Sequence, residues 1–320
     1  MTVWTIVSVL LMAAVAWAAW FVSRNFSASL SRDDLARYAH ETLILPDGME
    51  VNYRVLGNPS GRTILLVHGG GGSLGDWEPW YRYLEGDYRV IGVDLPGHGL
   101  TGPLPDEDYG PIRFAVFVRD FVEAMRLEDF VIAGHSFGGD TVVRYVVDNR
   151  GKASALILVA SGGFMPDEDE VPENEKAMLR FAGSWFGKLA LRYYGNREVM
   201  KRGAAAYFYD KSAMSEEFVD RIWALSRYAP TRGALYQLLV HSMASYEDVT
   251  GLDTIDVPTL ILWGDKDHVA LPRDARRFHA GIEGSELVLY EGVGHMIQEE
   301  HTEQSAKDLL GFLERRVRGR

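Results

Sequence analysis

The sequence contains no cysteine and has no excess of positive charge. Among its 320 residues, 45 Asp and Glu outnumber 33 Lys and Arg, giving a formal net charge of −12 at pH 7. The absence of cysteine excludes disulfides, thiolate catalysis and Cys-ligated metal sites. The acidic balance argues against a nucleic-acid partner, because such partners are bound by a basic face. The chain is long enough to bury a full hydrophobic core in one large domain or two smaller ones.

Charged side chains are also missing from residues 1–23. Residues 3–22 form a nearly continuous apolar run, close to the roughly 20 residues that a bilayer-spanning helix needs. Trp4 lies near one end of the run and Trp20 near the other, as in interfacial aromatic belts. We therefore expect a transmembrane anchor at 1–23, single-pass in a bacterial inner membrane, followed by a juxtamembrane segment at 24–40.

Two other interpretations of this segment stay open, a cleaved secretory signal and a buried core helix. Ala14-Val15-Ala16 resembles a cleavage site, but no Lys or Arg precedes the run. The run also exceeds the roughly 7–15 residues of a signal-peptide core. Arg24, Arg32 and Arg37 follow the run, so the positive-inside rule favours a cytoplasmic domain without deciding the side of the membrane.

Short β-rich runs alternate with helical patterns over much of the chain. The expected elements are a hairpin at 42–55, strands at 63–67, 89–93, 130–133, 155–160, 259–263 and 286–290, and a closing helix at 302–317. This alternation predicts an α/β fold with a mostly parallel, eight-stranded sheet and helices on both faces.

The alternation stops between Met165 and Thr254, where no strand-like run occurs. Amphipathic patterns rich in aromatic residues take its place. We expect a helical cap, or lid, at 165–254, inserted into a core made of residues 41–164 and 255–320.

A G-x-S-x-G pattern, centred on Ser136, follows the apolar run that ends at Ala133. A serine on such a strand-to-helix turn projects its hydroxyl above the sheet. The N-terminus of the next helix points at the same place and favours developing negative charge. A serine hydroxyl still needs a base to remove its proton, and that base needs an orienting acid.

The base and the acid are expected on loops after the carboxyl ends of strands. His295 lies in a glycine-containing loop after the last predicted strand and fits the base. Asp267 lies in the loop after the penultimate strand and fits the acid. Asp265, in the same loop, fits a brace of the turn, and Asp167 is a third candidate for the acid.

Backbone N–H groups are expected to form an oxyanion hole, one from Phe137 and one from Gly70. Gly70 belongs to a run of four glycines after His68. No Lys-Ser/Thr pair follows that run, which argues against a phosphate loop. The spacing of His295, Glu299 and His301 matches no helical zinc motif. We expect no cofactor and no metal.

Together these motifs resemble the α/β-hydrolase superfamily. The resemblance covers about residues 42–317 and rests on His68-Gly69, Asp94 to Gly99, Gly134 to Gly139, Gly264 to Asp267 and Gly294-His295. It implies a catalytic triad of Ser136, Asp267 and His295. The serine disfavours haloalkane dehalogenases and epoxide hydrolases, which have aspartate there. With its expected anchor and cap, the layout is similar to membrane-anchored monoacylglycerol lipases and bacterial membrane-anchored lysophospholipases. The glycine run also resembles carbon–carbon bond hydrolases of aromatic catabolism.

The expected function is hydrolysis of a carboxylic ester through an acyl-enzyme. An acylglycerol, lysophospholipid or phospholipid is the expected substrate, with other esters open. A carbon–carbon bond hydrolase, an acyltransferase or perhydrolase, and a non-catalytic ligand-binding member are the alternatives. The expected partners are the substrate and a membrane, with no nucleic acid, and a homodimer is compatible with the sequence.

Overall fold

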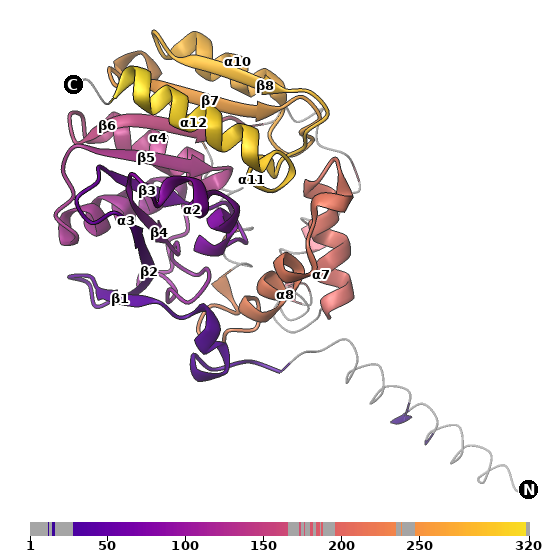
Figure 1. Cartoon of the computed structure of the whole chain (residues 1–320). Helices are drawn as coiled ribbons and strands as arrows, with labels where there is room; N and C mark the ends of the chain where they lie inside the picture. The colour runs from indigo at the N-terminus through magenta and orange to yellow at the C-terminus, as the bar shows by residue number, and fades with distance from the viewer. Residues whose placement is uncertain are drawn as a thin grey trace, which may run out of the picture.

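Eight strands form one sheet in the computed structural model of this chain (Figure 1). The structure describes residues 28–165, 196–234 and 247–317, with Met12, Val15, Ala16, Leu238 and seven isolated residues between 173 and 187. The strands are β1 (Glu41–Ile44), β2 (Glu50–Gly57), β3 (Thr63–Val67), β4 (Arg89–Val93), β5 (Phe130–His135), β6 (Ala153–Val159), β7 (Thr259–Gly264) and β8 (Glu286–Tyr290).

The strand order β1-β2-β4-β3-β5-β6-β7-β8 places β5 inside the sheet. Only β1 with β2 and β2 with β4 pair antiparallel, and the other neighbours are parallel. Every residue of β5 and of β7 is buried. Their continuous apolar runs match strands covered by helices on both faces, which is why the sequence locates them well.

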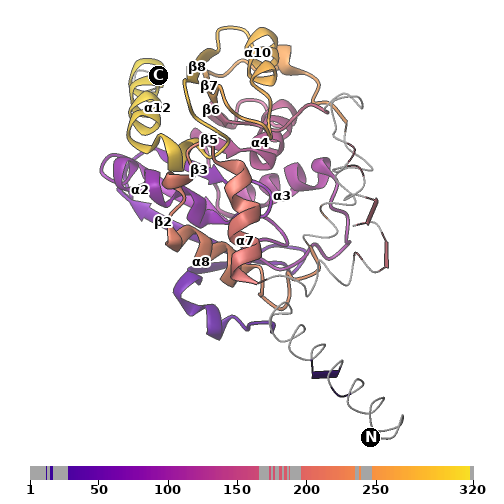
Figure 2. The ribbon, with the colours of Figure 1, turned by 90° about the vertical axis from the view of Figure 1, so that its right-hand side faces the viewer.

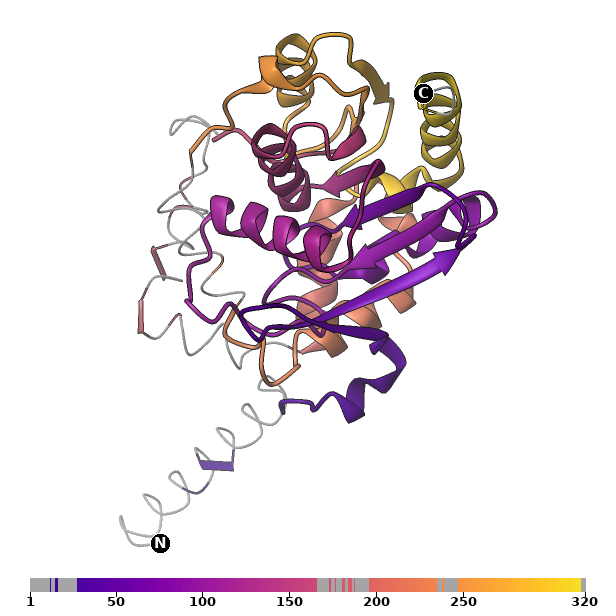
Figure 3. The same cartoon turned by 90° about the vertical axis from the view of Figure 1, so that its left-hand side faces the viewer.

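Helices cover both faces of the sheet. The α-helices that the structure describes are α2 (Glu78–Leu84), α3 (Pro111–Ala124), α4 (Phe137–Asp148), α7 (Arg197–Ala204), α8 (Glu216–Leu225), α10 (Pro272–Gly281), α11 (Ile297–Glu300) and α12 (Thr302–Arg316). Helices α2 and α12 lie on one face, while α3, α4 and α10 lie on the other (Figures 2 and 3). Short 3-10 helices are η1 (Asp33–Tyr38), η2 (Leu74–Trp77), η4 (Ala205–Tyr207), η5 (Lys211–Ala213) and η6 (Leu252–Thr254).

Helices α7 and α8 lie beyond the carboxyl ends of β5 and β7, where the strand arrows point (Figure 1). Both belong to the segment predicted as a helical cap, and their sequences place apolar side chains on one side. The predicted cap boundaries, 165 and 254, stay a prediction, as do the two core ranges.

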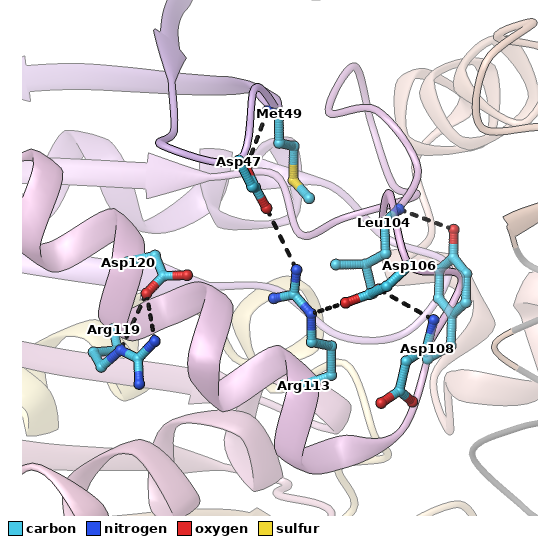
Figure 4. Close-up of polar contacts among 9 residues, drawn as sticks. Asp47, Met49, Leu104, Asp106, Asp108, Arg113, Arg119 and Asp120 are labelled. Carbon is cyan, nitrogen blue, oxygen red and sulfur yellow. Dashed lines mark hydrogen bonds and ion pairs between the residues drawn. The ribbon is translucent and has the colours of Figure 1, made fainter.

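An arginine ties the β1–β2 hairpin to the start of α3. The Nε of Arg113 donates to Asp106 at 2.7 Å, and its Nη2 lies 3.4 Å from Asp47 in the hairpin turn (Figure 4). Asp47 also accepts a hydrogen bond from the backbone N–H of Met49. This contact joins the antiparallel part of the sheet to the α3 face. Ion pairs of this kind near the surface contribute at most about 1 kcal/mol to stability.

The prediction of a transmembrane helix is corrected. In the part of the chain that the structure describes, no helix is both long and apolar enough to cross a bilayer. Residues 1–23 lie outside that part, except Met12, Val15 and Ala16. The prediction rested on hydropathy and length alone, which a spanning helix requires but which do not establish one. The inner-membrane, single-pass localisation built on it is corrected with it.

The described part of the segment predicted as juxtamembrane, from residue 28 onward, contacts the folded domain. Leu35 of η1 is buried with Leu100 and Leu225. The guanidinium of Arg32 donates to the carbonyl of Leu100 and to the side chain of Asn52. These contacts make the described part of 24–40 a component of the folded domain.

Candidate active site

Ser136 lies at the sharp turn between β5 and α4. Its backbone has φ 52° and ψ −122°, a conformation that a side-chain-bearing residue adopts only under strain. The turn is held because the N–H of Ser136 donates to Val159, and its carbonyl accepts from Gly139, Asp140 and Gly162. The sequence therefore yields the predicted nucleophile turn, with the serine preceding the first residue of a twelve-residue helix.

The glycines of the pattern make this turn possible by close packing. A Cβ on Gly134 would lie 2.4 Å from the carbonyl oxygen of Gly138, and a Cβ on Gly138 would lie 2.3 Å from that of His68. Both distances are too short for any side chain. The turn therefore requires glycine at both positions of the G-x-S-x-G pattern.

Asp267 and His295 lie together, as predicted. Oδ2 of Asp267 is 2.7 Å from Nδ1 of His295, and both side chains are almost fully buried. Oδ1 of Asp267 accepts hydrogen bonds from the backbone N–H groups of Val269 and Ala270. With Nδ1 bound to a carboxylate, Nε2 of His295 is the ring nitrogen available to act as a base.

The residue before the serine connects the nucleophile turn to the base. His135 and His295 have ring centroids 4.8 Å apart, and Nε2 of His135 is 3.0 Å from the carbonyl oxygen of His295. Within the described residues, Ser136 makes no side-chain hydrogen bond to His295. Such bonds are often long in sites without substrate.

The other two acid candidates differ in position. Asp265 accepts a hydrogen bond from the N–H of Gly292 and contacts Lys266, so it braces the β7 loop against the loop before His295. Asp167 lies outside the described residues. Asp267 is the candidate that the structure brings to the histidine.

The two predicted oxyanion donors lie side by side. A Cβ built on Gly70 would be 3.7 Å from Cβ of Phe137, and one built on Gly69 would be 3.0 Å from Cβ of Ser136. Among the described contacts, the N–H of Gly70 donates to no protein acceptor. Phe137 is the first residue of α4, where N–H groups lack helical partners. Gly70 and Phe137 thus lie close to each other beside Ser136.

Buried polar groups brace the loops around these donors. Nε2 of His68 accepts from the N–H of Leu95, and Asp94 accepts from the N–H groups of Leu74 and Leu100. Burial lowers the pKa of His68 to about 4, so its ring is neutral at pH 7. Burial raises the pKa of Asp94 to about 6, against the lowering effect of its hydrogen bonds. These residues hold the glycine loop in place.

A buried arginine joins the segment carrying α8 to the same loops. Nη2 of Arg221 is 3.3 Å from Asp76 of η2 and 3.7 Å from Glu299 of α11. Burial raises the pKa of Glu299 to about 7, while Arg221 lowers it. Gly75 leaves room for this arrangement, since a Cβ there would lie 2.5 Å from Cδ of Arg221.

No group of three or more His, Cys, Asp or Glu side chains fit to hold a metal occurs among the residues that the structure describes.

A family model for the alpha/beta hydrolase fold matches residues 62–302. The chain belongs to the alpha/beta hydrolase fold family. Among curated relatives of this hydrolase, 2-hydroxy-6-oxo-6-(2'-aminophenyl)hexa-2,4-dienoic acid hydrolase of Metapseudomonas resinovorans is 28% identical over 300 residues, covering 92% of this chain and 97% of that protein.

Two solved structures resemble this chain in fold. A membrane phospholipase A, described as a bacterial virulence factor, matches with a TM-score of 0.73 and 22% identity over 97% of both chains, which shows the fold alone. A lipase described as putative, from Acinetobacter baumannii, matches with a TM-score of 0.70 and 26% identity, over 90% of this chain and 97% of that one.

Three contacts with the loop that carries His295 could not be predicted from the sequence of this hydrolase. They come from His135, from the carbonyl of Tyr207 and from the carboxylate of Glu300. His135 lies inside the G-x-S-x-G pattern, which gives no sign of this contact. Glu300 lies five residues after His295 in the sequence, and this spacing does not tell which backbone groups a carboxylate reaches.

Proposed function

We propose that this protein is a serine hydrolase that cleaves carboxylic esters through an acyl-enzyme. The observation that carries the proposal is the Asp267–His295 pair at 2.7 Å, in which His295 contacts His135, the residue before a serine on a strained turn. Nε2 of His295 takes the proton of Ser136 as its Oγ attacks the ester carbonyl. The N–H groups of Phe137 and Gly70 stabilise the oxyanion that forms.

The second half of the reaction reverses these roles. The tetrahedral intermediate collapses, the C–O bond to the alcohol breaks, and His295 donates its proton to the departing oxygen. Water then enters, His295 removes a proton from it, and the hydroxide attacks the acyl carbon. Release of Ser136 yields the carboxylic acid and restores the neutral histidine. Asp267 stays ionised and holds Nδ1–H of His295 throughout.

Acyl lipids such as acylglycerols, lysophospholipids or phospholipids are the finer proposal for the substrate. The support is the 26% identity to the solved structure described as a putative lipase. Exposed aromatic side chains in the segment before β7, such as Tyr207 and Tyr209, offer apolar surface near the base. An acyl chain would bury such surface at about 25 cal/mol per Å².

A carbon–carbon bond hydrolase is the second candidate. The relative of Metapseudomonas resinovorans, matched over 92% of this chain, supports it. The same serine, base and oxyanion donors would serve, but the departing group is a carbon atom, so the substrate needs a ketone that can accept the electron pair of the breaking bond.

The test is a substrate panel applied to the wild type and Ser136→Ala. The panel holds p-nitrophenyl esters from acetate to palmitate, a lysophospholipid, a monoglyceride and a 2-hydroxy-6-oxodienoate. We expect ester turnover that falls on the order of 10⁶-fold in kcat in the variant, as when a triad nucleophile is removed. Turnover of the dienoate alone would favour the second candidate. Near-normal ester turnover by Ser136→Ala would overturn the role of the serine.

A further inference from the structure

Glu300, the last residue of α11, binds backbone groups from two separate segments. Its Oε1 accepts a hydrogen bond from the N–H of Gly294 at 3.1 Å. Its Oε2 accepts from the N–H groups of Tyr209 and Asp210, at 3.0 and 2.9 Å. One carboxylate therefore satisfies three donors, two of them in the segment between α7 and α8 and one beside His295.

The same two segments also meet directly. The N–H of His295 donates to the carbonyl of Tyr207 at 2.9 Å, and the two rings have centroids 5.9 Å apart. A Cβ on Gly294 would lie 2.5 Å from the backbone nitrogen of Tyr209, so no side chain fits between the segments. The backbone of 207–210 thus forms one wall of the loop that carries the base.

We propose that Glu300 is a positioning residue that joins segment 207–210 to the Gly294–His295 loop and so holds His295 in its orientation toward Ser136. The inference rests on the proposed function, because it assigns His295 the role of base. It adds that segment 207–210 is part of the catalytic assembly: any movement of that segment is transmitted to the base through Glu300.

The chemistry of the carboxylate makes the proposal specific. Both oxygens of an ionised carboxylate accept hydrogen bonds, whereas an amide has one accepting oxygen and one donating NH₂. Glu300→Gln therefore keeps the size of the side chain but turns its NH₂ toward at least one of the three N–H donors. Either Gly294 or the pair Tyr209 and Asp210 loses its acceptor.

The experiment compares Glu300→Gln with two controls in the full-length protein. Glu303→Gln changes an exposed glutamate of α12 that pairs with Lys307. Tyr290→Phe removes a hydrogen bond to Asp308 on the same helix without touching the His295 loop. The measurements are kcat and KM for an ester that the wild type hydrolyses, the rate of labelling by a small fluorophosphonate, the melting temperature, and the NMR signal of the Nδ1 proton of His295.

We expect kcat and the labelling rate of Glu300→Gln to fall about 10- to 100-fold, because His295 loses its orientation, while KM stays within about twofold. Each tenfold loss of rate corresponds to about 1.36 kcal/mol of lost transition-state stabilisation. The Nδ1 proton signal should shift or broaden. Glu303→Gln should match the wild type. Tyr290→Phe should lower the melting temperature while its labelling rate stays normal.

Wild-type kcat and an unchanged Nδ1 proton signal in Glu300→Gln would overturn the inference. The inference would also be overturned if Tyr290→Phe lost as much rate as Glu300→Gln at an equal loss of melting temperature. The role of Glu300 would then be purely structural. If Glu300→Gln does not fold, Glu300→Asp replaces it: the side chain is one methylene too short to reach both segments. A wild type that hydrolyses no ester and is not labelled refutes the proposed function instead, and the Nδ1 signal still decides the coupling.

Discussion

At the scale of single residues, Asp267 uses its two oxygens for different tasks. Oδ1 is fixed by the N–H groups of Val269 and Ala270, which leaves Oδ2 directed at Nδ1 of His295. The aspartate is therefore oriented by backbone donors, and it orients the histidine in turn. An amide in its place cannot satisfy both sets of contacts, because one of its two ends is a donor.

Asp267→Asn should lower kcat by about 10³- to 10⁴-fold with little change in the fold, since the histidine would take the wrong tautomer. Steady-state kinetics on the best ester of the panel measures this. Asp265→Asn is the matched control, because an asparagine can still accept from Gly292. A larger loss in Asp265→Asn than in Asp267→Asn would make Asp265 the acid.

Single residues also mark how far the sequence alone could lead. Ser136, Asp267 and His295 each follow a strand that the sequence locates, so their positions could be predicted from strand ends. The carboxylate of Glu300 binds backbone N–H groups, and Tyr207 contributes its backbone carbonyl. Their partners depend on how two loops fold against each other, which no spacing encodes.

At the scale of elements, three short helices meet in one buried charge cluster. Arg221 of α8 lies between Asp76 of η2 and Glu299 of α11. The buried guanidinium of Arg221 holds α8 in place only while neighbouring carboxylates compensate its positive charge. Because burial raises the pKa of Glu299 to about 7, its ionisation changes within the physiological range.

This pKa predicts how stability depends on pH. A carboxyl group whose pKa is higher in the folded protein than its ordinary 4.5 stabilises the folded state fully below pH 4.5, and this contribution is lost as pH rises through about 7. Glu299→Gln removes that dependence. The melting temperature of the variant relative to wild type should therefore be higher at pH 8 than at pH 5.

Thermal unfolding between pH 5 and 8 measures the effect. Glu198→Gln, on the exposed side of α7, is the control and should run parallel to the wild type. A difference between Glu299→Gln and wild type that is the same at every pH would contradict the prediction.

The elements themselves were predicted unevenly, for a physical reason. Central strands such as β3 and β5 are buried on both faces and read as apolar runs. The segment after β3 forms η2 from Leu74, and α2 follows with Pro79 in its first turn, where a missing N–H costs nothing. A tight 3-10 turn of four residues leaves no periodic pattern in a sequence.

At the scale of the whole molecule, the sheet is most protected at its middle. All residues of β5 are buried, whereas β1 is an edge strand with three of its four residues exposed. An edge strand has a ladder partner on one side only. Local opening should therefore be easiest at the antiparallel edge and hardest around the strand that carries Ser136.

Hydrogen exchange monitored by NMR or mass spectrometry should find the amides of β5 and β3 exchanging last, at rates set by global unfolding, and those of β1 exchanging first. Equal protection of β1 and β5 would contradict this. The edge strand β8 at the other end of the sheet, with one buried residue in five, should resemble β1.

The strand order also divides the chemistry between two halves of the chain. The serine and both oxyanion donors come before residue 165, and the acid and base come after residue 258; the β6–β7 ladder joins the two groups. Neither half holds a complete set of reacting groups. Under the proposed function, a chain cut between β6 and β7 should therefore leave neither piece able to hydrolyse an ester, and activity should require the β6–β7 pairing.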